Sequence, residues 1–331
     1  MHQILLLCGG GGSEHDISLK SAEYLAAKLS SLDNVILHQA VLQPDRWETP
    51  EGRPCTLSSS RQFTVQGGEG TVIDYAVPCI HGCPGETGDI QSFFEIIGLP
   101  YLGCPPEGNR LCFNKVSTKL WLSGLDVPNT PYVFLPVNSP ASHARAFQAM
   151  RKWGCVFVKA ASQGSSVGCY RVDELKDLEK AVNDAFRYSS QVLVEKAEKA
   201  RELEVAVYEF RGELVATKPG EILTSGSGFY SFDEKYSATS STGTAVEAGD
   251  LTAEQQEKIR DYALRAFRGL GLRDLSRVDF FLTAEGEILL NEINTFPGMT
   301  PISMFPKMME HRGDSMAEYL NDRIASTLKN R

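Results

Sequence analysis

One segment decides the fold of this chain: residues 277–300, which read RVDFFLTAEGEILLNEINTFPGMT. Two apolar runs, 278–282 and 288–291, flank Glu285-Gly286, and this arrangement predicts a β-hairpin. Alternate residues of a strand point to the same face of a sheet. The polar residues at alternate positions of this hairpin should therefore meet on one face.

Four polar side chains are expected on that face: Arg277 and Asp279 from the first strand, and Glu292 and Asn294 from the second. Two carboxylates and an amide oxygen are hard ligands that suit Mg²⁺ or Mn²⁺ together with ATP phosphates and water. An adjacent arginine suits an anionic intermediate. The alternative is a solvated hairpin face that carries charge pairs. The tail 297–300 favours a functional site over this alternative. A strand that ends in acidic, amide and glycine residues is unusual for an ordinary solvent-exposed surface but suits a binding site.

The rest of the last third is expected to be antiparallel. Strands are predicted at 203–208 and 214–217 around the turn 210–213, and a helix at 254–269. Residues 225–243 are polar and rich in glycine and serine. A loop of that length inside a compact domain is usually disordered or a functional lid.

The first hundred residues read as a parallel sheet with helices. Apolar residues 4–8 predict a strand, Gly9–Gly12 a turn and 17–29 a helix, with Ser13-Glu14 at the capping position. Further elements are expected as strands at 35–41 and 72–77 and as a helix at 93–97. The four-glycine turn does not match a dinucleotide fingerprint, because no acidic residue ends the second strand.

Prolines and glycines break the stretch 100–108, which is a candidate domain boundary. Beyond it the sequence predicts helices at 110–124 and 173–186, and strands at 155–159 and 192–195. The chain has 331 residues, 42% of them hydrophobic, which is too long for one simple core and indicates two or three domains.

Composition excludes several classes of function. The formal net charge of -9 argues against a broad basic surface for nucleic acid. No apolar run reaches the roughly 20 residues that a membrane span needs, and the apolar start, 1–8, is too short for a signal peptide. The 8 cysteines form no C-x-x-C pair, so we expect buried, reduced thiols in a cytosolic protein.

The loop 159–168, KAASQGSSVG, is a candidate phosphate site. Its lysine ends a strand, and backbone N–H groups of a small-residue loop can surround phosphates. It is not the G-x-x-x-x-G-K-[ST] loop of the strand–loop–helix ATPases. A flexible surface loop remains the alternative.

Two weaker signals accompany this loop. Glu195, Lys196 and Ala197 end a strand and could hold adenine and ribose, although salt-bridged surface residues would look identical. The loop 81–88, HGCPGETG, is fixed by glycines and a proline and presents His81 and Glu86. A histidine in such a loop is as easily structural as functional.

Assembled in order, these motifs closely resemble the D-alanine–D-alanine ligases of the ATP-grasp superfamily over essentially the whole chain. The glycine turn with Glu14 and Ser18 resembles the family's N-terminal signature, 81–88 its H-G-x-x-G-E-x-G, and 291–300 its C-terminal signature. The resemblance implies a mixed α/β and α+β fold of three domains with a nucleotide held between the second and third. The implied domains are 1–107 (a parallel α/β domain), 108–196 (the central subdomain) and 197–331 (the C-terminal subdomain, with a mobile lid near 225–243).

The resemblance also implies a role for each matching residue. The hydrogen-bonded trio that closes the lid would be Glu14, Ser165 and Tyr236. Arg277 and the Gly298 backbone would stabilise the acyl-phosphate and the oxyanion. The D-alanine sites would use Glu14, with His81 nearby, and Ser303 and Met304. ATP would be held by Lys115, Lys159, Glu195, Lys196, Ala197, Glu202 and Lys235. Two Mg²⁺ or Mn²⁺ ions would be carried by Asp279, Glu292 and Asn294.

The implied activity is ATP-dependent joining of two D-alanine molecules for peptidoglycan precursor synthesis and cell wall biogenesis. It would proceed through an acyl-phosphate in the cytoplasm, in a homodimer that binds neither nucleic acid nor membrane. The chain departs from the family at Ala160, where proline is usual, and at Glu247-Ala248, in place of Pro-Ala. Tyr236 favours the dipeptide product, because D-lactate-using relatives lack it.

Two other functions compete with this one. A ligase of altered acceptor would use D-lactate or D-serine. A non-enzymatic nucleotide or amino-acid sensor would have lost metal ligands, yet Asp279, Glu292 and Asn294 are all present.

Overall fold

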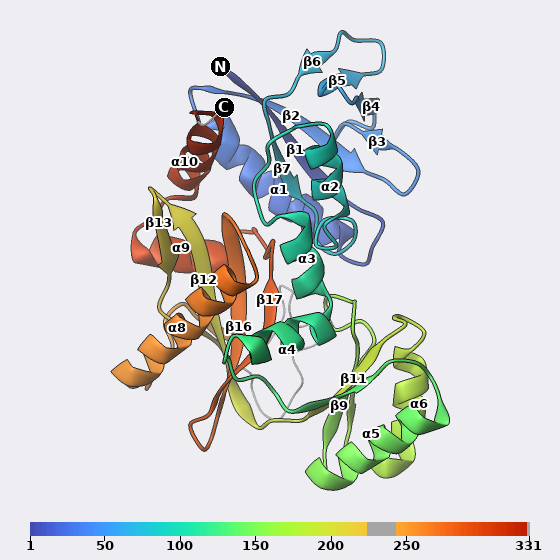
Figure 1. Ribbon diagram of the computed structural model, residues 1–331. Helices are drawn as coiled ribbons and strands as arrows, with labels where there is room; N and C mark the ends of the chain where they lie inside the picture. The colour runs from blue at the N-terminus through green and yellow to red at the C-terminus, as the bar shows by residue number, and fades with distance from the viewer. Residues whose placement is uncertain (224–242, 330–331) are drawn as a thin grey trace.

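Three β-sheets organise the computed structural model, which describes residues 1–223 and 243–329 (Figure 1). The first sheet has the strand order β6-β5-β4-β3-β2-β1-β7, the second β10-β9-β11-β8, and the third β15-β14-β12-β16-β17 with β13 pairing β12. The mixed α/β and α+β class expected from the sequence is confirmed. No helix among the described residues is long and apolar enough to cross a membrane.

The N-terminal sheet is mixed rather than parallel throughout. Strand β1 pairs in parallel with β2 and β7, whereas β3 to β6 extend the sheet as short antiparallel strands. The strand predicted at 72–77 is divided, because Ile73 and Asp74 separate β6 from β7. The elements are β1 (His2–Gly9), α1 (His15–Ser30), β2 (Val35–Leu42), β3 (Trp47–Glu48), β4 (Pro54–Leu57), β5 (Gln62–Val65), β6 (Thr71–Val72), β7 (Tyr75–Cys79) and α2 (Asp89–Ile96).

Two helices, not one, follow the broken stretch: α3 (Pro106–Phe113) and α4 (Lys115–Gly124). The single helix predicted at 110–124 is therefore wrong. Asn114 is extended, and its side chain accepts from the N–H groups of Val116 and Ser117, so it ends one helix and caps the next. This cap places Lys115 in the first turn of α4.

The central sheet is formed by β8 (Tyr132–Leu135), β9 (Val156–Ala160), β10 (Cys169–Val172) and β11 (Val192–Lys196). Helices α5 (Pro140–Trp153) and α6 (Leu175–Ala185) pack against it and bury an apolar core that includes Leu135, Met150, Val158 and Val182. In Figure 1 these helices lie on the outer side of β9 and β11, so the opposite face is left for the rest of the molecule.

The C-terminal sheet is antiparallel, as expected. It contains β12 (Ala200–Phe210), β13 (Glu213–Ala216), β14 (Gly220–Leu223), β15 (Gly243–Ala245), β16 (Leu275–Thr283) and β17 (Ile288–Asn294), with helices α8 (Ala253–Gly269), α9 (Met304–Arg312) and α10 (Met316–Lys329). Helix α8 begins at a capping box made by Thr252 and Gln255.

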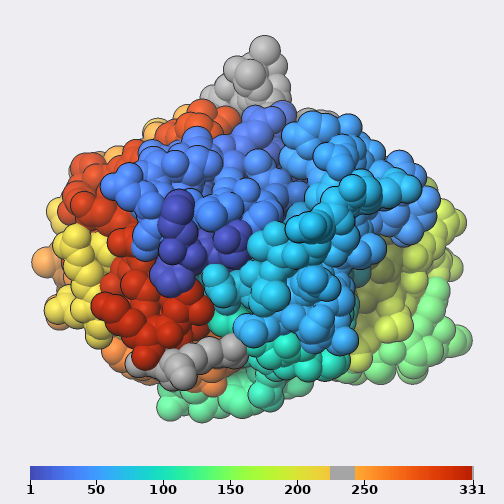
Figure 2. Space-filling view, turned by 90° about the horizontal axis from the view of Figure 1, so that it is seen from above, coloured from blue at the N-terminus to red at the C-terminus, as the bar shows by residue number. Residues whose placement is uncertain are grey.

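The N- and C-terminal parts share one hydrophobic core. Ile4 and Leu25 of the first sheet and its helix belong to the same buried cluster as Tyr208, Phe305 and Tyr319. Figure 1 shows α10 beside α1, and in Figure 2 the N-terminal residues (blue) and the C-terminal residues (red) lie side by side on one face. The first and third sheets are therefore held together by packing as well as by the chain.

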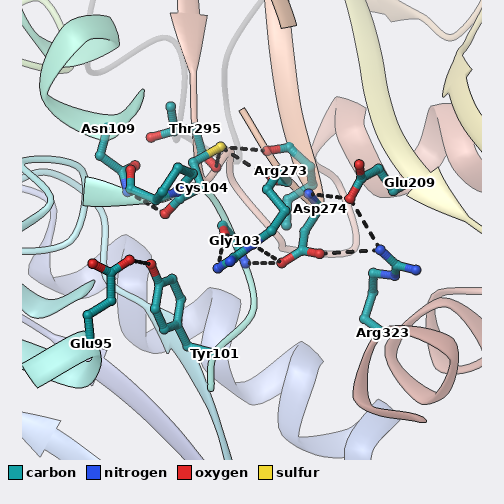
Figure 3. A network of polar contacts seen from close by, with 12 residues as sticks. Glu95, Tyr101, Gly103, Cys104, Asn109, Glu209, Arg273, Asp274, Thr295 and Arg323 are labelled. Atoms are coloured by element: carbon teal, nitrogen blue, oxygen red, sulfur yellow. Dashed lines mark hydrogen bonds and ion pairs between the residues drawn. The ribbon is translucent and has the colours of Figure 1, made fainter. Parts of the chain in front are cut away.

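A polar network reinforces this junction (Figure 3). Asp274, which precedes β16, is 3% exposed and accepts the Gly103 N–H at 2.7 Å through Oδ2. Arg323 of α10 lies 3.4 Å from Asp274 Oδ1 and 3.2 Å from Glu209 of β12. Burial raises the pKa of Asp274, while the Arg273 charge opposes that rise. One carboxylate thus links the end of the N-terminal part to two elements of the C-terminal part.

Candidate active site

A cleft of about 650 Å³ lies between the second and third sheets. Its apolar walls include Phe157, Leu203, Ile222, Phe280 and Phe281, and its polar lining includes Lys115, Lys159, Arg277, Asp279 and Glu292. An apolar slot with a few convergent charged groups is the usual form of a small-molecule site. The predicted phosphate loop and the predicted acidic hairpin therefore face one space.

The hairpin predicted within residues 277–300 is confirmed as β16 and β17. Its polar residues share one face, as the alternation of side chains along a strand predicts. Arg277 pairs with Asn294 across the two strands, and Asp279 pairs with Glu292. The Arg277 guanidinium donates to both oxygens of Asp279, from Nε at 2.8 Å and from Nη2 at 2.7 Å. Arg277 also lies 3.3 Å from Glu204 on β12. Although burial disfavours its charge, these carboxylates hold the pKa of Arg277 well above its usual value.

The donor set on this face fits a hard divalent cation. Asn294 donates from Nδ2 to Asp279 Oδ2 at 2.9 Å, which leaves its carbonyl oxygen as an acceptor. Among the described residues no group of three His, Cys, Asp or Glu side chains could hold a metal. The fit therefore depends on the amide oxygen of Asn294 in addition to Asp279 and Glu292, all of which are oxygen donors of the kind that Mg²⁺ and Mn²⁺ prefer.

Glu195 is the centre of a buried charge cluster. Its Oε1 lies 3.1 Å from Lys119 Nζ, and its Oε2 lies 2.6 Å from Lys159 Nζ. Burial disfavours the charged carboxylate, but the two ammonium groups lower the pKa of Glu195 to about 2. Glu195 therefore stays ionised and fixes Lys159 in the cleft.

Sequence analysis missed Lys119, which is 2% exposed and also donates to the Thr130 carbonyl at 3.1 Å. Burial lowers its pKa, while Glu195 opposes that change. One signal was available in the sequence: Lys119 follows Lys115 by four residues, so both lie on one face of α4.

The loop after β9 is held by Lys115. Its Nζ donates to the Gln163 carbonyl at 2.6 Å, and its backbone N–H donates to the Ala161 carbonyl at 2.9 Å. Ser165 and Ser166 have φ angles of 48° and 64°, a left-handed conformation that is uncommon for serine. Such backbone is often found at functional sites, where the surrounding contacts maintain it.

Glu14, which precedes α1, and Ser165, in the loop after β9, are brought together although they are far apart in the sequence. The Ser165 hydroxyl donates to Glu14 Oε1. Glu14 occupies the N-cap position of α1, as predicted, but its side chain makes no capping hydrogen bond. Glycines leave room for the carboxylate, because a Cβ on Gly82 or Gly164 would lie 2.9 or 2.7 Å from Glu14 Oε2. Two members of the predicted trio are thus in contact. Lys235 and Tyr236 lie outside the described residues. So does the predicted lid at 225–243, apart from its last residue, which begins β15.

The His81 loop lies next to this carboxylate. Glu86 Oε2 accepts the Gly82 N–H at 2.8 Å, and burial together with the Glu14 charge raises the pKa of Glu86. His81 is buried, with Nε2 2.9 Å from Ser21 Oγ and Nδ1 3.1 Å from the Phe296 carbonyl. Burial lowers the pKa of His81 to about 4, so the ring is neutral at pH 7.

The segment after β17 carries the residues predicted for the second amino acid. The Thr300 N–H donates to Ser303 Oγ at 3.1 Å, and a Cβ on Gly298 would lie 3.0 Å from the same oxygen. Met304 is buried at the start of α9. Its Cε lies close to Gly220, since a Cβ on that glycine would be 2.4 Å away. Gly298 and Ser303 are therefore close together.

The predicted adenosine residues line the cleft. The Lys196 side chain pairs with Glu198 at 2.8 Å, and the Lys196 and Ala197 N–H groups already donate to Pro131 and Cys155 carbonyls. Glu202 lines the cleft from β12. Sequence analysis missed Phe157 and Cys155 here, because a single aromatic residue or thiol in a strand carries no pattern.

The cysteines are reduced, but not all of them are buried. Cys83 is exposed, and Cys155 and Cys169 are partly exposed in the cleft wall. The expectation of uniformly buried thiols is therefore wrong for these three residues.

Two sheets around a cleft that presents lysines on one side and an acidic, amide-bearing hairpin on the other define a ligase of the ATP-grasp fold. Family models described as "D-ala D-ala ligase N-terminus" and "D-ala D-ala ligase C-terminus" match residues 3–104 and 121–324. The chain belongs to the D-alanine–D-alanine ligase family.

Individual relatives support this assignment. A D-alanine–D-alanine ligase from Tolumonas auensis is 61% identical over 98% of both chains. A crystal structure of D-alanyl-alanine synthetase A from Vibrio cholerae has a TM-score of 0.94 at 51% identity, covering 99% of this chain and 98% of its own. The VanG D-Ala:D-Ser ligase from Enterococcus faecalis has a TM-score of 0.85 at 26% identity, covering 98% of both chains.

Proposed function

We propose that this enzyme joins two D-alanine molecules to D-alanyl-D-alanine at the expense of ATP, for peptidoglycan precursor synthesis. One observation supports this most strongly: Ser165 of the phosphate loop donates to Glu14 of the N-terminal domain beside the cleft that holds Arg277, Asp279 and Glu292. An ammonium-binding carboxylate therefore stands next to a phosphate-transfer site.

ATP is proposed to enter the cleft with its adenine between apolar side chains such as Phe157 and Phe281. Lys196, Ala197 and Glu202 would contact adenosine, and Glu195 would act by fixing Lys159. Lys115 and Lys159, with Lys235 from outside the described residues, would hold the phosphates as point charges.

A pair of Mg²⁺ or Mn²⁺ ions, held by Asp279, Glu292 and Asn294, would neutralise phosphate charge when bound. Arg277 orients the Asp279 carboxylate through its two hydrogen bonds. Because Arg277 lies on the same face, its remaining N–H groups would approach the charge that develops on the transferred phosphate.

In the first step the carboxylate of the first D-alanine attacks the terminal phosphorus of ATP. The bond to ADP breaks, and an acyl-phosphate forms. Glu14 would bind the ammonium group and so orient this carboxylate. His81 would lie nearby, in the loop 81–88. Ser165 and Tyr236 would hold Glu14 in place and close the site, since water would hydrolyse the acyl-phosphate.

In the second step the neutral amine of the second D-alanine attacks the acyl carbon. The tetrahedral intermediate collapses, the bond between carbon and the phosphate oxygen breaks, and the nitrogen passes its extra proton to the departing inorganic phosphate. The Gly298 N–H and Arg277 would stabilise the oxyanion. Ser303 and Met304 would line the site of the second amino acid, next to Gly298.

Three further parts of the proposal concern the whole protein. We place the activity in the cytoplasm, where ATP is available, and expect a homodimer without nucleic-acid or membrane partners. The division into 1–107, 108–196 and 197–331 remains our proposal for the domains, and each observed sheet lies inside one of these ranges.

The test is a product assay with ATP, Mg²⁺ and D-alanine, read by mass spectrometry and by phosphate release. We expect D-alanine-dependent phosphate release and one dipeptide per ATP. ATP turnover without dipeptide at any pH would overturn the proposal. Adding D-serine or D-lactate in competition with D-alanine distinguishes a ligase of altered acceptor, because the mixed product would then dominate.

A further inference from the structure

Both ring nitrogens of His81 form hydrogen bonds with protein groups. The chemistry of the two partners determines which nitrogen donates and which accepts. Nδ1 lies 3.1 Å from the Phe296 carbonyl, which can only accept a hydrogen bond. Nδ1 must therefore carry the proton. In a neutral imidazole Nε2 is then an acceptor, so the Ser21 hydroxyl, at 2.9 Å, must donate to it.

The Ser21 oxygen completes a closed path. Because its hydrogen is given to His81, its lone pairs are free to accept, and the Met299 N–H donates to it at 3.2 Å. Three hydrogen bonds thus connect the Phe296 carbonyl through His81 and Ser21 to the Met299 N–H. Ser21, His81, Phe296 and Met299 are all at most 5% exposed, so water does not compete with these bonds.

Gly298 lies between the two ends of this path. Its backbone is fixed two residues before by the Phe296 carbonyl and one residue after by the Met299 N–H. A third contact, from the Thr300 N–H to Ser303, holds the segment beyond it. Both groups that reach this segment from the N-terminal domain, Ser21 and His81, come from elements that also flank Glu14.

We propose that Ser21 and His81 are positioning residues, which set the Gly298 N–H for the oxyanion by holding residues 296–299 from the N-terminal domain. The proposal rests on the proposed function, because Gly298 is the oxyanion donor only if an acyl transfer takes place. It assigns to Ser21 a role in the second step, and it assigns to His81 a role through the backbone rather than through contact with the reacting atoms.

Such positioning residues are needed because an oxyanion donor works only over a narrow range of distances. A backbone N–H stabilises the oxyanion only when it lies about 3 Å from the developing charge, and removing one such donor lowers kcat by about 10²–10³-fold. A displacement of about 1 Å costs on the order of 10²-fold. Phe296 and Met299 bury their side chains in the core, but Gly298 between them has no side chain, so the direction of its N–H depends on what holds the backbone on either side.

The first test compares Ser21→Ala with Ser18→Ala. Both serines are 0% exposed on α1, but Ser18 bonds the Gly9 N–H and the Cys79 carbonyl, not the 296–299 segment. We expect Ser21→Ala to lower kcat for dipeptide by about 10–100-fold, with KM for ATP changed less than about threefold. Ser18→Ala should lose similar thermal stability and keep kcat within about threefold. Equal kcat losses in the two variants would overturn the proposal.

The second test reads the proton on His81 directly. ¹⁵N NMR of the imidazole, assigned by its absence in His81→Gln, should show a protonated Nδ1 and a bare Nε2 at pH 7. An Nε2–H tautomer or an imidazolium would overturn the proposal whatever the kinetics. Ser21→Thr retains the hydroxyl and should recover at least about a third of the kcat lost in Ser21→Ala; a folded Ser21→Thr without recovery would count against it.

The two proposals fail in different ways. If the wild-type enzyme forms no dipeptide from D-alanine, the proposed function fails, although the NMR pattern is unaffected. If the wild type forms dipeptide and Ser21→Ala retains its kcat, only the positioning role fails.

Discussion

Arg277 binds both carboxylate oxygens of Asp279, a residue only two positions further along the same strand. Neighbours at this spacing share a face, so the strand itself supplies the pair without a tertiary contact. The Asp279 carboxylate therefore has a fixed orientation before ATP or a metal binds. A preorganised group loses little freedom when the ligand arrives.

The predicted metal ligands can be tested with Glu292→Gln. The amide keeps the size of the side chain but loses its charge, so we expect kcat to fall at least about 100-fold and Mn²⁺ binding, followed by electron paramagnetic resonance, to weaken. The free energy of unfolding should change by less than about 1 kcal/mol, because Glu292 is partly exposed. Glu287→Gln, exposed on the same hairpin, is the control and should behave as wild type. Normal activity in Glu292→Gln would refute the metal assignment.

The buried cluster around Glu195 makes Lys119 important for stability. Lys119→Met removes one of two cationic partners from a carboxylate that stays ionised, and we expect the free energy of unfolding to fall by about 2–3 kcal/mol. KM for ATP should rise, because Lys159 alone must then balance Glu195. Lys152→Met, on the exposed side of α5, is the matched control. Denaturant titration and initial rates measure both effects; a Lys119→Met enzyme as stable as the control would contradict this account.

The contact between Ser165 and Glu14 should affect the first D-alanine more than ATP. Hydrogen bonds to charged groups contribute about 1.5–3 kcal/mol, so Ser165→Ala should raise the KM for D-alanine at the first site by about 10-fold or more. KM for ATP should stay within about twofold. Ser162→Ala, in the same loop, provides the comparison. An ATP effect as large as the D-alanine effect would mean that the loop as a whole had moved.

His81 makes a pH-dependent contribution to stability. Its folded pKa of about 4 lies below the usual histidine value of 6.5, so the unfolded chain binds more protons between these values. The contribution is complete above about pH 6.5 and is lost as the pH falls toward 4, an effect of about 3 kcal/mol. In His81→Gln the free energy of unfolding should be lower at pH 7 and should depend less on pH in this window. Parallel pH dependences for the two proteins would disprove the buried neutral state.

The Asp274 network can be separated into its charge and its geometry. Asp274 has a φ of 61°, which asparagine tolerates and alanine does not. Asp274→Asn should cost about 1–2 kcal/mol for the lost pairing with Arg323, and Asp274→Ala should cost more, since it also loses the bond from Gly103. Thermal denaturation of both variants measures the order. Equal losses would show that backbone conformation contributes nothing.

Local pattern was sufficient for much of the fold. The hairpin of β16 and β17, helix α8 and the first strand follow from period and turn residues, and the structure contains them. The break at Asn114 was missed because a cap and a helix interior both allow polar residues there. The short strands β3 to β5 were missed because two- to four-residue strands depend on their neighbours more than on their own sequence.

The site divides in the same manner. Arg277, Asp279, Glu292 and Asn294 meet because strand alternation is a local rule, which a sequence reveals. Lys119 and Ser21 matter because of partners 76 and 60 residues away, Glu195 and His81. The spacing of Lys115 and Lys119 indicates a shared helix face, but no local pattern encodes the contact with a distant partner. The contact of Glu14 with Ser165 spans 151 residues and was reached only through the family resemblance.

The core shared by Ile4, Leu25, Phe305 and Tyr319 has a consequence for biosynthesis. A ribosome delivers the first sheet long before α9 and α10. The surface of α1 that packs against α10 therefore stays uncovered while the nucleotide-binding parts are translated. Helices α9 and α10 complete this core last. The N-terminal sheet therefore cannot reach its full stability during translation. Nascent chains halted before residue 304 should consequently bind chaperones that recognise apolar surface, and chains released after residue 324 should not.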